Sequence, residues 1–396
     1  MTKFSYFLLL GAVLAPLSAH AGGFQLSEYS TTNLGRSFAG TTVVGDDLSA
    51  IAFNPSGMIL NQSAAQINAT YVHLRGKAED LTDPSHDKGK IRADKALPAM
   101  FAQYALDDNS RIGFGVYVPF GLGTDYELPW FGSDEADKSY IEVVDYNLAL
   151  AHRLSSKLTV GASVIFETLK AHLSNTSGSG AAYSNMKADS TDLLWQVGAL
   201  YEFSQNTRLA VSYRPKSVHE LRGHHSFNYD ARYGDCGTKL QFPESAYLSL
   251  MHRLNKVTLS ATARWTRWSR FDILDIWSTA FTPGTRTPVG AVNENWKDVW
   301  MFSLGADYQL NDKWTVRGGV AYDKTPIRKA EYRTARIPDN NRVILSLGTS
   351  YQTGNWQFDA GVSHLLFRKS QENRSNLKAE YTMNTEMLSL GVQYKF

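Results

Sequence analysis

The chain has 396 residues, of which 43% are hydrophobic and 20% charged, with a formal net charge of +2 and a single cysteine, Cys236. A balanced charge without a basic run argues against nucleic acid as a partner. One cysteine excludes an intramolecular disulfide and leaves a free thiol or an intermolecular partner. The mean hydropathy of −0.30 is that of a soluble protein, but membrane β-barrels give similar values because half of each strand is polar.

The first 21 residues have the pattern of a secretory signal peptide. Lys3 provides a short positive region, residues 7–17 form an apolar core, and residues 19–21 (Ala-His-Ala) form a small-x-small cleavage site. The apolar run is too short to span a bilayer as a helix. We therefore expect the mature chain to begin at Gly22.

Residues 22–65 show no alternation of polar and apolar side chains, and their many small residues favour short helices and turns. A segment of this length is too short to bury an independent core. We expect it to lie inside a surrounding wall, as a small helical plug at the end where the first strand starts.

Residues 66–396 contain fourteen short segments with a period of two. Successive side chains of a strand point to opposite faces, so one face of each segment suits lipid and the other a wet lumen. In residues 257–266, shifting the register by one would place Arg264 in lipid, at a cost of about 2–4 kcal/mol near the midplane. The residues that we expect to face inward are Asp145, Asn147, Glu167, Gln196, Glu202, Arg208, Arg264, Asp307, Arg317 and Asp359.

The gaps between these segments are alternately short and long. The short gaps are 107–111, 153–157, 204–206, 255–256, 311–313 and 353–355. The long gaps are 75–97, 119–143, 171–192, 215–245, 268–299, 323–341 and 367–385. An even strand number with short turns at one end and long loops at the other is typical of outer-membrane barrels of Gram-negative bacteria. The sequence thus predicts an all-β, 14-stranded antiparallel transmembrane barrel, with the short turns in the periplasm.

Loop 119–143 is unusually apolar and contains Leu122, Trp130 and Phe131. Contiguous exposed apolar surface usually marks a binding site. Packing against neighbouring loops to close the barrel mouth explains the composition equally well, so both interpretations stay open.

No catalytic, metal or cofactor site is expected. The chain has no G-x-S-x-G, H-E-x-x-H or P-loop motif, and the pair His224-His225 has no spaced partner for a metal. An outer-membrane lipase would need a nucleophile beside a base, which no motif supplies. A general porin and an adhesin or phage receptor also fit a barrel pattern, although a porin has no need of residues 22–65.

Several short motifs, in order along the mature chain, are similar to those of one family. They are residues 23–26 (Gly-Phe-Gln-Leu), 34–36 (Leu-Gly-Arg), 54–55 (Asn-Pro), 113–124, 265–269 (Trp-Thr-Arg-Trp-Ser), 296–298 (Trp-Lys-Asp), 314–319, 337–339 (Ile-Pro-Asp) and the terminal Phe396. In this respect the chain resembles the FadL/OmpP1/TodX family of outer-membrane transporters of hydrophobic compounds. Ser56 stands where the family usually has alanine.

The resemblance implies passive transport of long-chain fatty acids or other lipophilic small molecules. An extracellular groove captures the cargo, which then leaves sideways through a gap at a kinked third strand. The third segment, 112–118, contains Gly113 and Gly115, and alternation alone would make it an ordinary strand end. Lipopolysaccharide and outer-membrane lipid would surround the barrel, and the barrel assembly machinery would recognise its terminal strand, which ends at Phe396.

The resemblance also implies roles for individual residues. Phe24 would contact the ligand tail, and Asn54 and Pro55 would form a turn of the N-terminal hatch that faces the third strand. Lys170 and Lys297 would lie near a ligand carboxylate. Thr168 stands where an arginine would accompany Lys170, which leaves aromatic or neutral lipophiles open as cargo.

Overall fold

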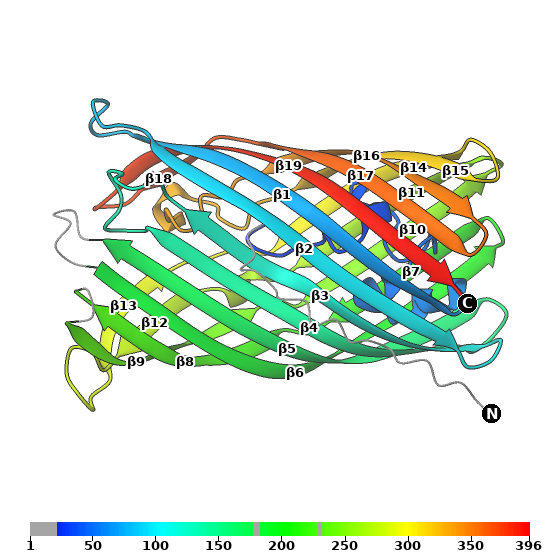
Figure 1. Cartoon of the computed structure of the whole chain (residues 1–396), viewed down its shortest axis with the longest axis horizontal. Coiled ribbons are helices and arrows are strands. Elements are labelled where there is room, and N and C mark those ends of the chain that lie inside the picture. The colour runs from blue at the N-terminus through cyan, green and yellow to red at the C-terminus, as the bar shows by residue number, and fades with distance from the viewer. Residues whose placement is uncertain (1–21, 177–182, 229–230) are drawn as a thin grey trace.

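The computed structural model describes residues 22–176, 183–228 and 231–396. Its strands form one antiparallel sheet that closes on itself, because β1 (Ala64–Asp80) pairs with β19 (Lys378–Lys395) along its whole length. Figure 1 shows the barrel from the side, with the C-terminus at the end that carries the short turns. The 14-stranded antiparallel barrel expected from the sequence is confirmed. The signal peptide expected over residues 1–21 lies outside the described residues.

Nineteen strand elements of the described chain make up these fourteen strands, because five strands are interrupted. The continuous ones, besides β1 and β19, are β2 (Gly89–Ala105), β3 (Ser110–Asp125), β4 (Lys138–Arg153), β5 (Leu158–Thr176), β6 (Tyr183–Ser204), β15 (Trp314–Asp323) and β16 (Arg342–Thr353). The interrupted ones are β7 (Thr207–Arg214) with β8 (Ser217–Phe227), β9 (Arg232–Phe242) with β10 (Ser245–Leu254), β11 (Val257–Thr266) with β12 (Ile273–Ser278), β13 (Thr287–Asn293) with β14 (Val299–Gln309), and β17 (Trp356–Phe367) with β18 (Ser370–Asn373).

The long gaps of the sequence pattern are mostly strand. In the segment 171–192, expected as a loop, residues 171–176 and 183–192 instead extend β5 and β6, which stay paired as far as Thr176 and Tyr183. Most boundaries predicted for the long loops were therefore wrong, whereas the loop predicted over 323–341 agrees with the segment between β15 and β16. Alternation ends where a strand leaves the lipid and both of its faces become wet, whereas backbone pairing continues, because the ladder depends on main-chain groups rather than on side-chain polarity.

The two faces of the wall have opposite character. Outward positions expose apolar side chains, as at Leu304 and Leu347, which are 62% and 66% exposed. Inward polar side chains bond the backbone of the segment inside the barrel: Asn147 donates to Ile51 O at 2.9 Å, and Gln196 donates to Phe53 O at 2.7 Å. Polar side chains of the wall therefore hold the segment inside the lumen.

An inner segment (residues 22–63) fills the lumen toward the end with the short turns, where Figure 1 shows its helices in blue. It contains α1 (Thr31–Leu34), α2 (Ala50–Phe53) and the 3₁₀ helix η1 (Pro55–Leu60), whereas η2 (Trp268–Arg270) and η3 (Ala330–Tyr332) lie in the wall and its loops. None of the helices in the described ranges is long and apolar enough to cross a membrane.

Glycines on the wall let the inner segment approach closely. A Cβ atom on Gly319 would lie 2.1 Å from Arg36 O, and one on Gly198 would lie 1.9 Å from Asn54 Oδ1. Neither position can hold a larger residue without displacing the inner segment, so its placement against the wall is sterically specified.

Candidate functional site

The ladder between β2 and β3 is incomplete. The two strands pair only from Met100↔Val116 to Ala105↔Arg111, although β2 goes on pairing with β1 and β3 with β4. Pro98 on β2 and Pro119 on β3 have no N–H to donate to a ladder, and β3 also shifts register between Tyr117 and Phe120. The wall thus has a gap in its hydrogen bonding between neighbouring strands.

The start of the inner segment covers the free edge of β3 from within. Leu26 N donates to Pro119 O at 2.8 Å, and Gly121 N donates to Phe24 O at 2.9 Å. Farther back, Gly22 N donates to Asp323 Oδ2 at 3.0 Å and Gly23 N to Asp339 Oδ2 at 3.1 Å. Residues 22–26 are therefore fixed at one end to buried carboxylates and at the other to the strand edge exposed by the gap.

Between these two attachments, the side chain of Phe24 is fully buried in an aromatic cage. Five rings have centroids 4.7–6.3 Å from its own: Phe120, Phe242, Trp268, Phe271 and Trp296. We call these residues the Phe24 cage. Trp268, Phe271 and Trp296 lie at the interruptions of the strands β11–β12 and β13–β14, so the breaks in those strands carry them into the lumen. The cage is an apolar site that the chain itself occupies.

The structure brings two of the sequence-predicted binding residues together, since Leu122 packs in the same apolar cluster as Phe24. Trp130 and Phe131 belong to a separate cluster at the barrel mouth, where Trp130 stacks on Tyr126 at a centroid distance of 3.9 Å. These two aromatics therefore pack the mouth of the barrel and lie apart from the cage.

The two candidate lysines point away from the cage. Lys170 is exposed and follows the buried, inward Leu169 on β5, so it lies on the opposite face of the strand. Lys297 is exposed, and its Nζ donates to Asn295 Oδ1 at 2.6 Å. Neither side chain lies where it could neutralise a carboxylate bound in the cage.

The expectation for Asn54 and Pro55 needs correction, because their turn does not face the third strand. Asn54 Nδ2 donates to Val211 O of β7 at 3.0 Å, and a Cβ on Gly161 of β5 would lie 2.8 Å from Pro55 Cβ. The polar turn docks here because Gly161 and Gly198 leave room for its backbone.

Gly113 and Gly115 lie in the paired part of β3, just before the gap. A Cβ on Gly113 would meet Met58 at 2.6 Å, and one on Gly115 would meet Phe101 at 2.8 Å. Larger residues at these two positions would therefore press against the inner segment and the wall rather than fill the gap.

Trp268 and Trp296 are cage residues to which the sequence pattern assigned no role, although both lie in the family-like motifs 265–269 and 296–298. A signal was present, because both residues stand where the alternation of polar and apolar residues stops. What the pattern could not show is that the two interruptions face the same part of the lumen as Phe24.

A buried ionic network lies beside the cage. Arg214 forms ion pairs with Asp145 and Glu167, and His219 Nε2 lies 2.8 Å from Glu167 Oε1. The guanidinium carbon of Arg214 is 5.9 Å from the ring centroid of Phe120. The cation nearest the aromatic rings is thus already held by two carboxylates.

Removing this cation should destabilise the barrel. We expect Arg214→Leu to lower the free energy of unfolding by about 3–5 kcal/mol, because Asp145 and Glu167 would be left buried without a counter-charge. Urea unfolding, followed by the loss of heat-modifiable migration on gels, measures the change. Lys88→Ala, which breaks an exposed ion pair with Glu79, is the control and should leave the midpoint where it is. The prediction would be contradicted if Arg214→Leu and Lys88→Ala unfolded at the same urea concentration.

A second hollow, of about 320 Å³, opens among the loops at the end of the barrel opposite the short turns. Leu173, Leu274 and Ile276 give it an apolar wall, and Glu294 and Arg336 add charged groups. Glu294 Oε2 also accepts a hydrogen bond from Trp296 Nε1 at 2.9 Å. We call this hollow the outer groove, and Glu294 and Trp296 connect it to the Phe24 cage.

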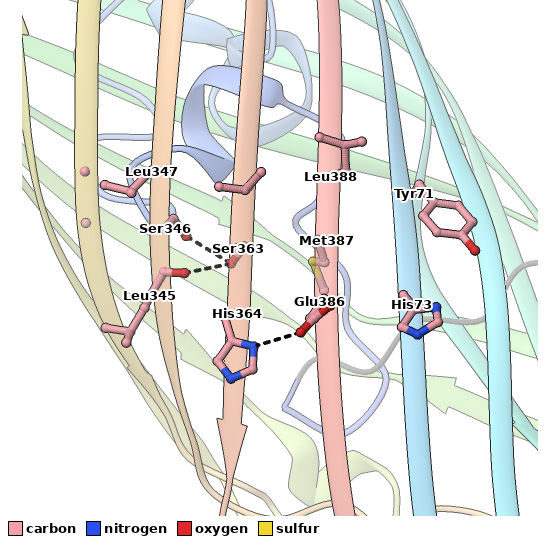
Figure 2. Close-up of a pocket in the computed structure, with 13 residues that line it drawn as sticks. Tyr71, His73, Leu345, Ser346, Leu347, Ser363, His364, Glu386, Met387 and Leu388 are labelled. Carbon is pink, nitrogen blue, oxygen red and sulfur yellow. Dashed lines mark hydrogen bonds and ion pairs between the residues drawn. The ribbon is translucent and has the colours of Figure 1, made fainter.

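A third hollow, of about 980 Å³, lies on the outside of the wall. Figure 2 shows it over β16, β17 and β19, with an ion pair between His364 and Glu386, whose atoms lie 3.8 Å apart, at its rim. Leu345 and Leu347 belong to the outward face, where they are 45% and 66% exposed. This hollow therefore faces the surrounding lipid.

In the described ranges, no group of three or more His, Cys, Asp and Glu side chains is arranged to hold a metal ion. Cys236, on β9, is buried and forms no disulfide with any described residue. The cage is lined by apolar side chains, whereas the outer groove is lined by both apolar and charged ones.

Comparison with known proteins gives a family match over residues 12–396, to the model described as outer membrane protein transport protein (OMPP1/FadL/TodX). The 47 kDa outer membrane protein of Pasteurella multocida is 26% identical, covering 100% of this chain and 99% of its own length. The long-chain fatty acid transport protein of Escherichia coli K12 is 23% identical, covering 98% of each chain.

Solved structures show the same fold. A Pseudomonas aeruginosa FadL homologue superposes with a TM-score of 0.84 at 24% identity, covering 94% of this chain and 100% of its own. The P. putida toluene transporter TodX gives a TM-score of 0.73 at 18% identity, covering 88% of this chain and 94% of its own.

Proposed function

Because the chain belongs to the OMPP1/FadL/TodX family of outer membrane transport proteins, we propose that it moves lipophilic small molecules from the outer groove, through the Phe24 cage, to the gap between β2 and β3. The protein is an outer-membrane transport channel and not an enzyme. The observation that carries the proposed route is the position of residues 22–26, which fill the cage and cover the free edge of β3 at the same time.

In this proposal the inner segment acts as a hatch. Its side chains and backbone fill the lumen, so a water-filled path down the barrel axis is blocked. Cargo enters the cage when Phe24 withdraws, and the same movement releases Gly121 and Pro119 at the edge of β3. One displacement would thus open both the binding site and the exit.

A lateral exit suits the physical chemistry of apolar cargo. A molecule that passes from the cage into the membrane between β2 and β3 keeps its apolar surface out of water, which is worth about 0.8 kcal/mol per buried CH₂. Transport along this route needs no nucleotide or cofactor, and consumption of the cargo inside the cell would drive it.

The cage favours uncharged cargo. Arg214 is held by Asp145 and Glu167, and Lys170 and Lys297 point to the outside. A carboxylate in the cage would therefore lie buried near aromatic rings without a counter-charge, which is unfavourable. Fatty acids remain candidates for capture in the outer groove, and neutral aromatic or aliphatic molecules are the proposed cargo of the cage.

Uptake by cells tests this function. Expression in Gram-negative cells without their own transporters of this family should raise the uptake of labelled ethylbenzene and 1-octanol but not that of a hydrophilic sugar. In planar bilayers the purified protein should conduct few ions, because the lumen is filled. Equal stimulation of sugar uptake, with a large steady conductance, would make the protein a general porin.

The outer groove should bind anions less well as the pH rises. Burial raises the pKa of Glu294 to about 7, so its carboxyl is largely neutral at pH 6 and ionised at pH 8. We expect an anionic amphiphile to bind roughly fivefold more weakly at pH 8, because two like charges 4 Å apart repel by about 1 kcal/mol in water. Titration of a fatty acid analogue with a permanently charged sulfonate head measures the change.

Arg336, Arg374 and Glu135 also line the outer groove. A control is therefore needed to show that the pH dependence comes from Glu294. Glu294→Gln should remove the difference between pH 6 and pH 8, and an uncharged amphiphile should show none in the wild-type protein. A pH dependence that persists in Glu294→Gln would contradict the assignment.

A further inference from the structure

Trp268 has a hydrogen-bond donor that the described structure leaves unused. Its side chain is fully buried, and its Nε1 atom has no hydrogen-bond partner among the described residues. A buried N–H without an acceptor is unfavourable, and buried tryptophans usually find a partner for this group. The unused donor therefore calls for an explanation at its position in the cage.

Two other buried tryptophans of the described chain behave in the ordinary way. Trp296, in the same cage, donates its Nε1 to Glu294 Oε2 at 2.9 Å. Trp130, at the barrel mouth, donates to Ala136 O at 2.8 Å. The contrast within the cage is informative, because Trp268 and Trp296 pack against each other with ring centroids 5.0 Å apart and yet only one N–H is satisfied.

The unused N–H lies beside the segment that cargo would displace. A Cβ atom on Gly23 would lie 2.7 Å from Trp268 Cζ2 and 3.0 Å from Cε2, the ring carbon that bears Nε1. Gly23 also has a φ of +68°, a conformation that disfavours larger residues. The chain at Gly23 thus packs directly against this edge of the indole, with Phe24 next to it.

We propose that Trp268 Nε1 donates a hydrogen bond to an acceptor oxygen of the cargo once residues 23–24 have withdrawn from the cage. The proposal rests on the proposed function, in that it takes the Phe24 cage as the cargo site. Among the neutral lipophiles proposed as cargo, it favours those with one uncharged acceptor, such as ketones, alcohols and esters. A carboxylate fits less well, because Arg214 is already paired and Glu294 borders the same cage.

Acetophenone and ethylbenzene are a suitable pair of probes, since they have nearly the same shape and only acetophenone carries an acceptor oxygen. Isothermal titration in detergent gives the affinity of the wild-type protein and of Trp268→Phe for each. We expect the preference for acetophenone over ethylbenzene to fall about tenfold in Trp268→Phe, as the loss of one neutral hydrogen bond to a buried group predicts.

Trp296→Phe is the matched control. It removes the same indole area from the same cage, but its N–H is already used by Glu294, so the ratio of the two affinities should not change. Replacing Trp268 by benzothienylalanine provides a second variant, because sulfur takes the place of the N–H while the ring keeps its size. The ratio of the affinities for acetophenone and ethylbenzene should fall as much in this variant as in Trp268→Phe. Because the benzothienyl ring keeps the size of the indole, a loosened cage cannot explain the fall.

Infrared spectroscopy supplies a readout that packing alone would not move. The carbonyl stretch of bound acetophenone should shift to lower wavenumber in the wild-type protein and in Trp296→Phe, and should return to its value in an apolar solvent in both Trp268 variants. If the affinity ratio and the carbonyl stretch are unchanged in both Trp268 variants, Trp268 does not donate to the cargo, although the cage can still be the cargo site. Failure of both probes to bind the wild-type protein would overturn the cage as a cargo site, and this inference with it.

Discussion

Phe24→Ala is expected to bind cargo about 30-fold more tightly than the wild-type protein while the barrel stays folded. Phe24 fills the cage and so competes with cargo for the same space. Burying a phenylalanine side chain is worth about 1.5–3 kcal/mol, so removing the ring lowers the free energy needed to empty the cage by about 2 kcal/mol, or roughly 30-fold in affinity. Titration with ethylbenzene measures the change.

Phe24→Leu is the control, because it keeps an apolar side chain in the cage and should produce a much smaller gain. Heat-modifiable migration on gels checks that both variants retain the barrel. Weaker binding by Phe24→Ala would mean that Phe24 holds the cargo by direct contact, as the family resemblance alone implies, and that it does not compete with it.

Pro98→Val combined with Pro119→Val should reduce uptake at least tenfold without weakening binding in the cage. These substitutions supply the two backbone donors that β2 and β3 lack at the gap, and β-branched residues favour a continuous ladder. Uptake of labelled ethylbenzene by cells measures transport, and titration of the purified protein measures binding. Slower exchange of the amides at positions 98–100 and 117–119 would show that the ladder has closed.

Pro288→Val is the matched control for a strand proline outside the gap, since Pro288 lies exposed in β13. It should leave uptake unchanged. If the double variant closes the ladder and still transports at the wild-type rate, the lateral exit is wrong, and a path through the inner segment becomes the better explanation.

Strand number and the two faces of the wall were predictable from the sequence, because each depends on local properties. Alternation over about ten residues determines which side chains face lipid, as Arg264 and Leu304 illustrate. The same parity also determines the side of Lys170, since Glu167 three positions earlier faces inward. Lys170 therefore had to face outward, and its assignment to the ligand came from the resemblance and not from the pattern.

Other features depend on contacts between segments far apart in the chain. The Asn54-Pro55 turn docks at Gly161 and Gly198 because their missing side chains leave space, and a single sequence does not show which glycines meet which turn. Long stretches predicted as loops are strands, because pairing outside the lipid leaves no alternation to detect.

The sequence by itself determined a 14-stranded barrel and a preceding segment outside its wall, which was expected over residues 22–65 and ends at residue 63 because β1 begins at Ala64. Both follow from alternation and turn length, which are encoded locally. Only the tertiary structure decided what that segment touches. Phe24 and Trp268 lie 244 positions apart in the numbering of the chain, and they meet because strand interruptions and the inner segment converge in one lumen. The candidate site is a product of that convergence, and no local pattern specifies it.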